Sequence, residues 1–216
     1  MDTILEANLR SLKQPDQDQS LASKLLASFV PSNFQDPARD YLPDKCITDL
    51  ITGDRIEGEF EKGDQVCDTA QLRELTLWVC AKACRTFAIT VQCDLGSIQL
   101  LLAMLVFKKT HFDDEKLPLA DPQQIAASPE QFDRRIWSDL KLRDFYDKQW
   151  RCLVPVFSPD RYDYNLLDKC IFPFTKESAI PKVGAFSSVH KVQIHPDHQK
   201  HQQMHKVSDN SLYFYA

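Results

Sequence analysis

The sequence predicts an α+β protein in which a mainly helical region, residues 1–172, is followed by an incomplete antiparallel β-sheet in residues 173–216. Apolar residues recur at helical spacing through most of the first region. After about Cys170 this spacing gives way to β-branched residues and period-two alternation. The charge changes as well, because residues 181–216 hold four Lys and two acidic residues, whereas the whole chain has a net charge of −5. We therefore expect two different structural units.

The helical region begins with two apolar stripes, which predict two helices separated by a polar stretch. Three prolines between residues 31 and 43 exclude a long helix there, so we expect at most a short helix over residues 41–53. Gly53, Gly58 and Gly63, flanked by acidic residues, predict turns and an exposed loop. The two apolar stripes are Ile4, Leu5, Leu9 and Leu12, then Leu21, Leu25, Leu26 and Phe29.

The clearest predicted helix begins at Asp68, which is a good N-cap residue, and continues to about Cys93. Gly96 ends it, and Ser97 caps a second helix that closes near Lys109. The apolar stripe of the first helix is Leu72, Leu75, Val79, Ala83 and Phe87, and that of the second is Ile98, Leu101, Leu102, Leu105 and Val106.

Residues 113–130 predict an acidic connection, whose first three acidic residues are expected to form solvated surface. Pro129 and Glu130 predict the first turn of a helix that runs to Leu153, either continuous or broken near Ser138, and stops before Pro155. Residues 183–194 then predict a β-hairpin, and the final segment SLYFYA predicts another strand. The apolar residues expected to be buried along the predicted helix are Phe132, Ile136, Leu140, Phe145, Trp150 and Leu153.

Composition and charge exclude several classes of protein. With 216 residues, 43% of them hydrophobic and 26% charged, the chain can bury the core of one ordinary domain or two small ones. The longest apolar run, residues 98–107, is half of the ~20 residues that cross a bilayer, so no membrane partner is expected. The net charge of −5 argues against a nucleic-acid partner. The N-terminus lacks the basic and apolar order of a secretory signal, which predicts an intracellular, cytoplasmic protein with reduced cysteines.

Several segments carry a resemblance to a known family. The stretch PKVGAFSSVHKVQIHPDHQ, followed by SLYFYA, resembles the first three strands of a protein kinase N-lobe. The segments YLPDKCITDLIT and QWRCLVPVFSPDRYDYNLLDKCIFPFT are similar to the region that precedes this lobe in divergent protein kinase-like proteins of fungi. The resemblance covers much of residues 41–216 and implies a helical region, 1–172, before a partial N-lobe, 173–216.

A kinase covers the ATP phosphates with a glycine-rich loop, G-x-G-x-x-G-x-V. Alignment on Val189 places Lys182, Gly184 and Ser187 at the three glycine positions, so only one glycine is kept. By pattern alone, an ordinary hairpin that contains one glycine is an equally good interpretation of this segment. The nucleotide-contacting residues that the resemblance implies are Gly184, Ala185, Phe186, Ser187 and Val189 above the nucleotide and Ala216 beneath the adenine.

The groups that perform phosphoryl transfer are absent from these 216 residues. Ala216 matches the alanine of the V-A-I-K motif, whose lysine would follow two positions later, and neither an HRD nor a DFG motif occurs. The resemblance therefore implies a truncated kinase-like protein with no catalytic residue of its own. ATP and magnesium are implied only for a complete parent, which would be an ATP-dependent protein Ser/Thr kinase.

Two other functions remain open from the sequence. In one, the helical region binds another protein and the β tail is vestigial. In the other, zinc binds the histidines of the tail, although a polar loop is the favoured interpretation of this cluster because no cysteine lies near it. We expect Cys80, Cys84 and Cys93 to be buried structural residues and not metal ligands. The histidines of the tail are His190, His195, His198, His201 and His205.

Overall fold

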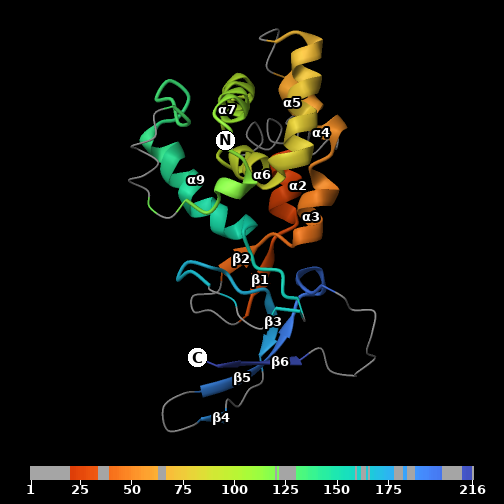
Figure 1. The fold of residues 1–216 in the computed structure, drawn as a ribbon, viewed down its shortest axis with the longest axis vertical. Coiled ribbons are helices and arrows are strands. Elements are labelled where there is room, and N and C mark those ends of the chain that lie inside the picture. Colours follow the sequence, from red (N-terminus) through yellow and green to blue (C-terminus); the bar gives the residue numbers. More distant parts are fainter. Residues whose placement is uncertain are drawn as a thin grey trace, which may run out of the picture.

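A computed structural model shows an α+β fold in which helices occupy one end of the long axis and an antiparallel sheet occupies the other (Figure 1). A small two-stranded sheet lies between these two parts (Figure 1). The described part of the chain contains seven α-helices. The structure describes residues 20–33, 39–62, 67–119, 121, 130–158, 160–161, 164, 166–177, 182–183, 188–200 and 211–215.

The first described element is helix α2 (Leu21–Ala27), which confirms the second apolar stripe. The Ser20 side chain caps it by accepting a hydrogen bond from the Ser23 amide. Strands β1 (Val30–Ser32) and β2 (Arg39–Tyr41) follow and pair antiparallel, a small sheet that the sequence did not predict. Helix α3 (Asp44–Leu50) is the expected short helix. The stripe at residues 4–12 lies outside the described residues.

Helix α4 (Gly53–Glu61) shows that the prediction of turns at Gly53 and Gly58 was wrong. Ile56 and Phe60 stand one turn apart on this helix and are fully buried, at 0% and 2% exposure. Burial of these two side chains against the other helices outweighs the cost of about 1 kcal/mol that each glycine imposes on a helix interior. The Phe60 ring packs edge-on against Phe87, with 5.6 Å between ring centroids.

The long helix predicted from Asp68 is divided into two helices, α5 (Thr69–Lys82) and α6 (Cys84–Gln92). The Asp68 cap is confirmed, since its carboxylate accepts a hydrogen bond from the Gln71 amide at 2.8 Å. The break falls at Ala83, which has φ −135° and ψ 30°. It occurs because the Asp114 carboxylate accepts hydrogen bonds from the Arg85 and Thr86 amides. Helical hydrogen bonds therefore do not run continuously from α5 into α6.

Helix α7 (Ser97–Lys109) ends at the predicted residue but begins one residue earlier, with Gly96 and not Ser97 as its N-cap, and it buries a different face. Ile98 is 49% exposed, and of the predicted stripe only Leu101 is buried. The helix is apolar almost all round, so periodicity could not tell which side faces the core. The residues that it buries are Leu100, Leu101, Ala103, Met104 and Phe107.

Helix α9 (Asp139–Cys152) begins directly after Ser138, where the sequence allowed a break, and the described residues 130–138 before it are not helical. Ser138 is its N-cap, and residues 130–136 form turns that place Phe132 and Trp137 in the core. The preceding connection contains a short 3-10 helix, η1 (Asp114–Lys116). Leu140 was predicted to be buried but is 65% exposed, because the helix turns this position away from the core.

The C-terminal sheet is built around strand β5 (Ser188–Ile194), which pairs antiparallel with all its partners. Strands β3 (Phe174–Glu177) and β4 (Lys182–Val183) pair with its two halves, and β6 (Ser211–Tyr215) pairs with it from Val189 to Gln193. The β4–β5 hairpin and the final strand that the sequence predicted are thus confirmed. The 3-10 helix η2 (Pro196–His198) follows β5 directly.

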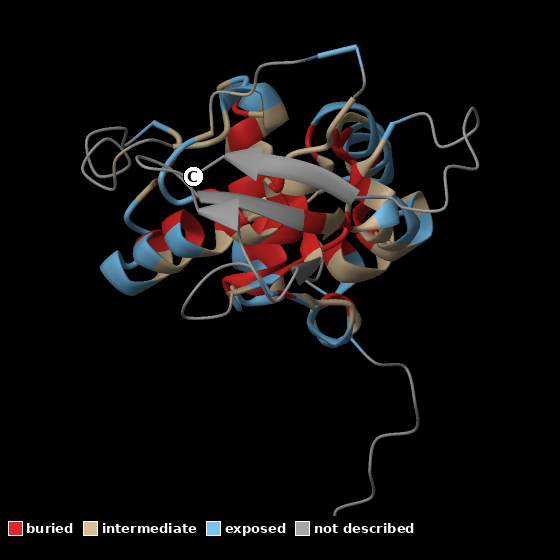
Figure 2. Cartoon of the chain, turned by 90° about the horizontal axis from the view of Figure 1, so that it is seen from below, coloured by how far each residue is buried: buried red, intermediate tan, exposed pale blue. Residues whose placement is uncertain are grey.

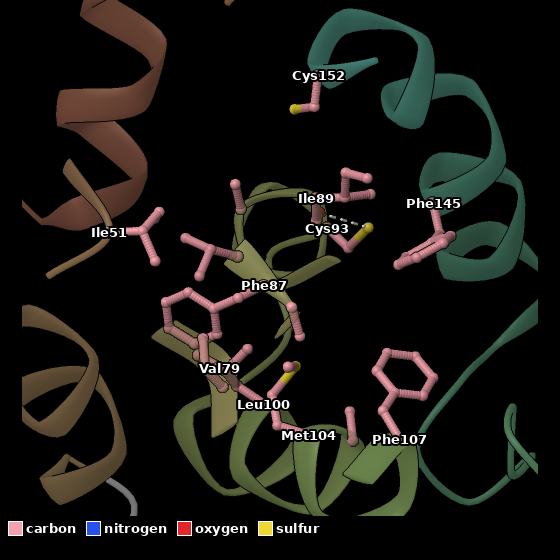
Figure 3. Close-up of a cluster of buried hydrophobic side chains, with 14 of the residues drawn as sticks. Ile51, Val79, Phe87, Ile89, Cys93, Leu100, Met104, Phe107, Phe145 and Cys152 are labelled. Carbon is pink, nitrogen blue, oxygen red and sulfur yellow. Dashed lines mark hydrogen bonds between the residues drawn. The ribbon is translucent and has the colours of Figure 1, made fainter. Parts of the chain in front are cut away.

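The buried side chains form one large cluster and two small ones. The large cluster contains buried residues from Leu21 to Cys152 and surrounds α6, with Val79, Phe87, Leu100 and Met104 pointing toward one another (Figure 3). Buried segments lie inside the ring of helices and exposed turns lie outside it (Figure 2). One small cluster joins the helices to the β-strands, and the other lies on the sheet. Among the described residues, no helix has the length and apolar character needed to cross a bilayer.

Candidate functional site

The residues that the sequence assigned to a nucleotide site fall largely outside the described part of the chain. Gly184, Ala185, Phe186, Ser187 and Ala216 are not described. The backbone of Val189 is described in β5, where it pairs with Lys182 of β4 and with Tyr215 of β6. The two strands that precede and follow residues 184–187 in the sequence, β4 and β5, are therefore antiparallel neighbours.

The described residues bring a different set of groups together, at the junction between the helices and the sheet. The Asn33 amide donates to the Phe174 carbonyl at 2.9 Å, which ties the turn after β1 to strand β3. The Asn33 side chain adds a 2.6 Å hydrogen bond to the Thr175 carbonyl. On the helical side, the Leu42 amide donates to the Arg151 carbonyl at 2.8 Å. The strands β1 and β2 thus connect α9 to the C-terminal sheet.

His198 of η2 is the central group of this junction, and it is 1% exposed. Its Nδ1 lies 3.0 Å from the Pro155 carbonyl oxygen, and its Nε2 accepts a hydrogen bond from the Asp44 amide at 3.2 Å. Because a carbonyl can only accept and an amide N–H can only donate, Nδ1 carries the proton in this arrangement. Burial lowers the pKa of His198 to about 4, so the ring is neutral at physiological pH.

Tyr41 and His195 complete the junction around this ring. The Tyr41 ring meets His198 edge-on at 5.4 Å and His195 at 6.1 Å between centroids. His195 caps η2, because its Nδ1 accepts from the Asp197 amide at 3.2 Å. Tyr41 is fully buried, and its hydroxyl has no hydrogen-bond partner among the described residues. Burial and the nearby Asp197 carboxylate raise the pKa of Tyr41, so this phenol stays protonated.

A polar network continues from the junction into the helices. Asp44 is the first residue of α3, and its carboxylate forms an ion pair with Arg85 near the start of α6. The Asp114 carboxylate of η1 accepts from the Arg85 and Thr86 amides at 2.9 Å and 2.8 Å. It also accepts from the Thr86 hydroxyl at 2.8 Å. Asp114 therefore caps the N-terminus of α6 from outside that helix.

No local sequence pattern indicates the roles of His198 and Asp114. His198 was interpreted as part of a polar loop, but it is buried, and Asp114 was interpreted as solvated surface, but it accepts three hydrogen bonds from α6. The only available hint was the missing cap at the start of α6, where Ala83 has no polar side chain.

Metal and thiol chemistry receive no support from the described geometry. Within the described residues, no three His, Cys, Asp or Glu side chains form a group that could hold a metal ion. The cysteine prediction was correct for Cys93, which is buried, but wrong for Cys80, which is exposed because it lies on the outer side of α5. Burial raises the pKa of Cys93 to about 12 and that of Cys152 to about 11, so both remain thiols and not nucleophilic thiolates.

An open hollow of about 200 Å³ lies beside the junction, between strand β2 and helix α9. Arg151 and Asp40 face each other across it at 3.8 Å, and Arg39 donates to the Lys169 carbonyl at 2.9 Å. These charges are thus partnered within the chain. The residues that line the hollow are Arg39, Asp40, Asp147, Arg151 and Ile171.

Comparison of the chain with protein-family models, curated proteins and solved structures found no match.

Proposed function

We propose that this chain is a kinase-like protein without phosphotransferase activity of its own, in which a helical region carries the first strands of a kinase N-lobe. A complete parent would be an ATP-dependent protein Ser/Thr kinase. The observation that carries the proposal is the strand order of the C-terminal sheet. In this sheet β5 pairs with β3 along one half and with β4 along the other, and it also pairs with β6.

This order supports the proposal because it agrees with the resemblance in three respects. The strands β4 and β5, which precede and follow Gly184 in the sequence, pair antiparallel, as the strands on either side of a glycine-rich loop do. The strand that follows it, β5, ends at the segment HPDH, which forms η2. The next strand along the chain, β6, then returns antiparallel to β5 and ends beside Val189, one residue before Ala216.

The proposed lack of activity depends on what phosphoryl transfer requires. A lysine must contact the α- and β-phosphates, a carboxylate must hold magnesium and an aspartate must accept the hydroxyl proton. The motifs that carry these groups, V-A-I-K, D-F-G and H-R-D, are not complete in these 216 residues. Nothing in the described junction replaces them, because its central histidine has both ring nitrogens engaged by backbone groups.

We therefore expect no saturable binding of MgATP by the 216-residue chain in isothermal titration calorimetry, and no transfer of labelled phosphate to a basic substrate protein. A single glycine in the loop supplies little of the backbone cradle that the phosphates need. The matched variant is Gly184→Ala. A micromolar Kd that is lost in Gly184→Ala would contradict the proposal at the level of nucleotide binding.

The proposed relation to kinases is tested separately, by sequencing the messenger RNA beyond the Ala216 codon. An open frame with a lysine two codons later, and with HRD and DFG motifs further on, supports the proposal. A stop codon directly after Ala216 would contradict a kinase parent for this transcript.

A helical protein-interaction module is the second candidate function. The observation that favours it is that, within the part of the chain that the structure describes, the large hydrophobic cluster contains no residue after Cys152, so the helices have a core of their own. We expect a chain ending at Pro173 to keep its helical circular dichroism and to unfold cooperatively at a lower Tm, because it loses only the junction contacts. Loss of cooperative unfolding would contradict an independent helical module.

A further inference from the structure

Among the described residues, His198 is the one buried ionisable group whose side chain links the C-terminal sheet to both α3 and the segment after α9. It follows β5 in sequence, yet its two ring nitrogens bond to Asp44 at the start of α3 and to Pro155 after α9. Its own carbonyl accepts from the Phe157 amide at 2.8 Å, and the Lys200 amide donates to the Phe157 carbonyl at 2.8 Å. The ring of His198 therefore contacts both α3 and the segment after α9, and the backbone of residues 198–200 adds two hydrogen bonds to the second of these segments.

The neutral ring satisfies all its partners, and the protonated ring does not. A proton added to Nε2 turns this atom from an acceptor into a donor, and it then faces the Asp44 amide N–H, which is also a donor. The start of α3 has no other side-chain cap, because its N-cap residue is Pro43. Protonation thus breaks a hydrogen bond, places a charge in a buried site and leaves the first amide of α3 without its acceptor.

The charged groups around His198 do not offset this loss. On α3, the Asp44 carboxylate attracts a proton to the ring but is already ion-paired with Arg85 of α6. On η2, His195 opposes the added charge and Asp197 favours it, and on β2 the neighbour is the neutral phenol of Tyr41. Desolvation is the largest effect on the ring, and it lowers the pKa of His198 to about 4.

We propose that His198 is a pH-sensitive contact that fixes the C-terminal sheet to the helical region at neutral pH and releases it locally on mild acidification. The large hydrophobic cluster is not expected to loosen on acidification, because His198 does not belong to it. Helices α5, α6 and α7 therefore stay packed when the junction opens.

The direction and size of the effect follow from proton linkage. A histidine with its pKa lowered to about 4 in the closed junction and an ordinary pKa of 6.5 in the open one binds fewer protons when closed. The contact is therefore fully present above pH 6.5 and is lost as the pH falls toward 4. Between pH 7 and pH 5, the opening equilibrium of the junction is expected to rise roughly 20-fold.

Hydrogen–deuterium exchange of the full chain at pH 7 and pH 5, corrected for intrinsic rates, tests this proposal. The amides of Asp44, Phe157 and Lys200 are expected to lose roughly 20-fold in protection, whereas those of α6 and α7 keep theirs. His198→Gln retains an acceptor for the Asp44 amide but cannot titrate, so its junction should show no such pH dependence. The matched control is His111→Asn, at an exposed histidine with φ 55°, a backbone conformation that asparagine accepts.

The outcomes separate the proposal from a general acid effect. Junction protection that falls in both the wild type and the control His111→Asn, but not in His198→Gln, supports the proposal. Protection that falls equally in α6, or that falls in His198→Gln as in the wild type, overturns it. A histidine NMR titration gives an independent readout: an ordinary pKa near 6.5 for His198 with unchanged junction amides would also overturn the proposal.

Discussion

Replacement of Phe145 by alanine is expected to lower the free energy of unfolding by about 4 kcal/mol, as is typical for removal of a fully buried aromatic ring. Phe145 lies on the inner face of α9 and is 0% exposed. Its ring faces Phe107 across the core (Figure 3). Alanine leaves a cavity that the rigid aromatic neighbours on two other segments cannot close.

The reason for the large effect is the arrangement of rings around Phe145. Phe132 and Trp137 meet it edge-on at 5.4 Å and 5.5 Å between centroids, and Phe107 lies at 6.1 Å. These rings come from α7 and from the turns before α9, so they are held by separate backbone segments. Edge-to-face pairs of this kind add about 0.5–1.5 kcal/mol each beyond the area that they bury.

Urea denaturation followed by circular dichroism measures this loss. Leu140→Ala is the matched control on the same helix, since Leu140 is 65% exposed and its truncation is expected to change the stability by less than about 0.5 kcal/mol. Equal losses for the two variants, or a loss below about 1 kcal/mol for Phe145→Ala, would show that the aromatic cluster does not stabilise the helices.

The comparison of these two residues shows which parts of the fold a single sequence could predict. Helices α2, α3, α5, α7 and α9 lie where apolar spacing or capping residues predicted them, because local signals set helix position. The prediction of which residues are buried on α7 and α9 was partly wrong, since Ile98 and Leu140 are exposed although they are as apolar as the residues that are buried. Which apolar side chain is buried depends on neighbours distant in sequence.

The candidate site was less predictable for the same physical reason. The β4–β5 hairpin was identified from local alternation, whereas the role of His198 depends on Asp44, 154 residues away in sequence. The break at Ala83 likewise depends on Asp114, which lies 28 and 29 residues beyond the amides that it accepts. No periodicity records such pairs, and the domain boundary at residue 172 and the nucleotide-contacting residues stay predictions.

The second large effect is expected for Asp114→Ala, which should lower the free energy of unfolding by about 3 kcal/mol, the scale of losing hydrogen bonds to a charged acceptor at a buried helix end. The three donors that lose their acceptor are the Arg85 and Thr86 amides and the Thr86 hydroxyl. Thr86 is 0% exposed, so water cannot replace the carboxylate without opening the core.

The neighbouring residue Asp113 supplies the matched control. Asp113→Ala removes the same charge one position earlier. Among the described residues, however, the Asp113 carboxylate accepts only from the exposed Glu115 amide, at 3.1 Å, so a loss of about 0.5 kcal/mol is expected. Asp114→Asn keeps one acceptor oxygen and should fall between the two alanine variants. Urea denaturation ranks the three variants. Equal effects of Asp113→Ala and Asp114→Ala would attribute the loss to net charge and would remove Asp114 as the cap of α6.

Because Arg85 also forms the ion pair with Asp44, the Asp114 cap lies two residues along a polar chain from His198. If the cap positions Arg85, Asp114→Ala should also lower the hydrogen-exchange protection of the Asp44 amide relative to that of the core amides. Phe145→Ala, at equal or greater cost in stability, should leave this ratio of junction protection to core protection unchanged. Exchange measured on both variants under native conditions decides this. A junction equally weakened by the two substitutions would mean that it responds to the overall stability of the helices and not to the polar chain.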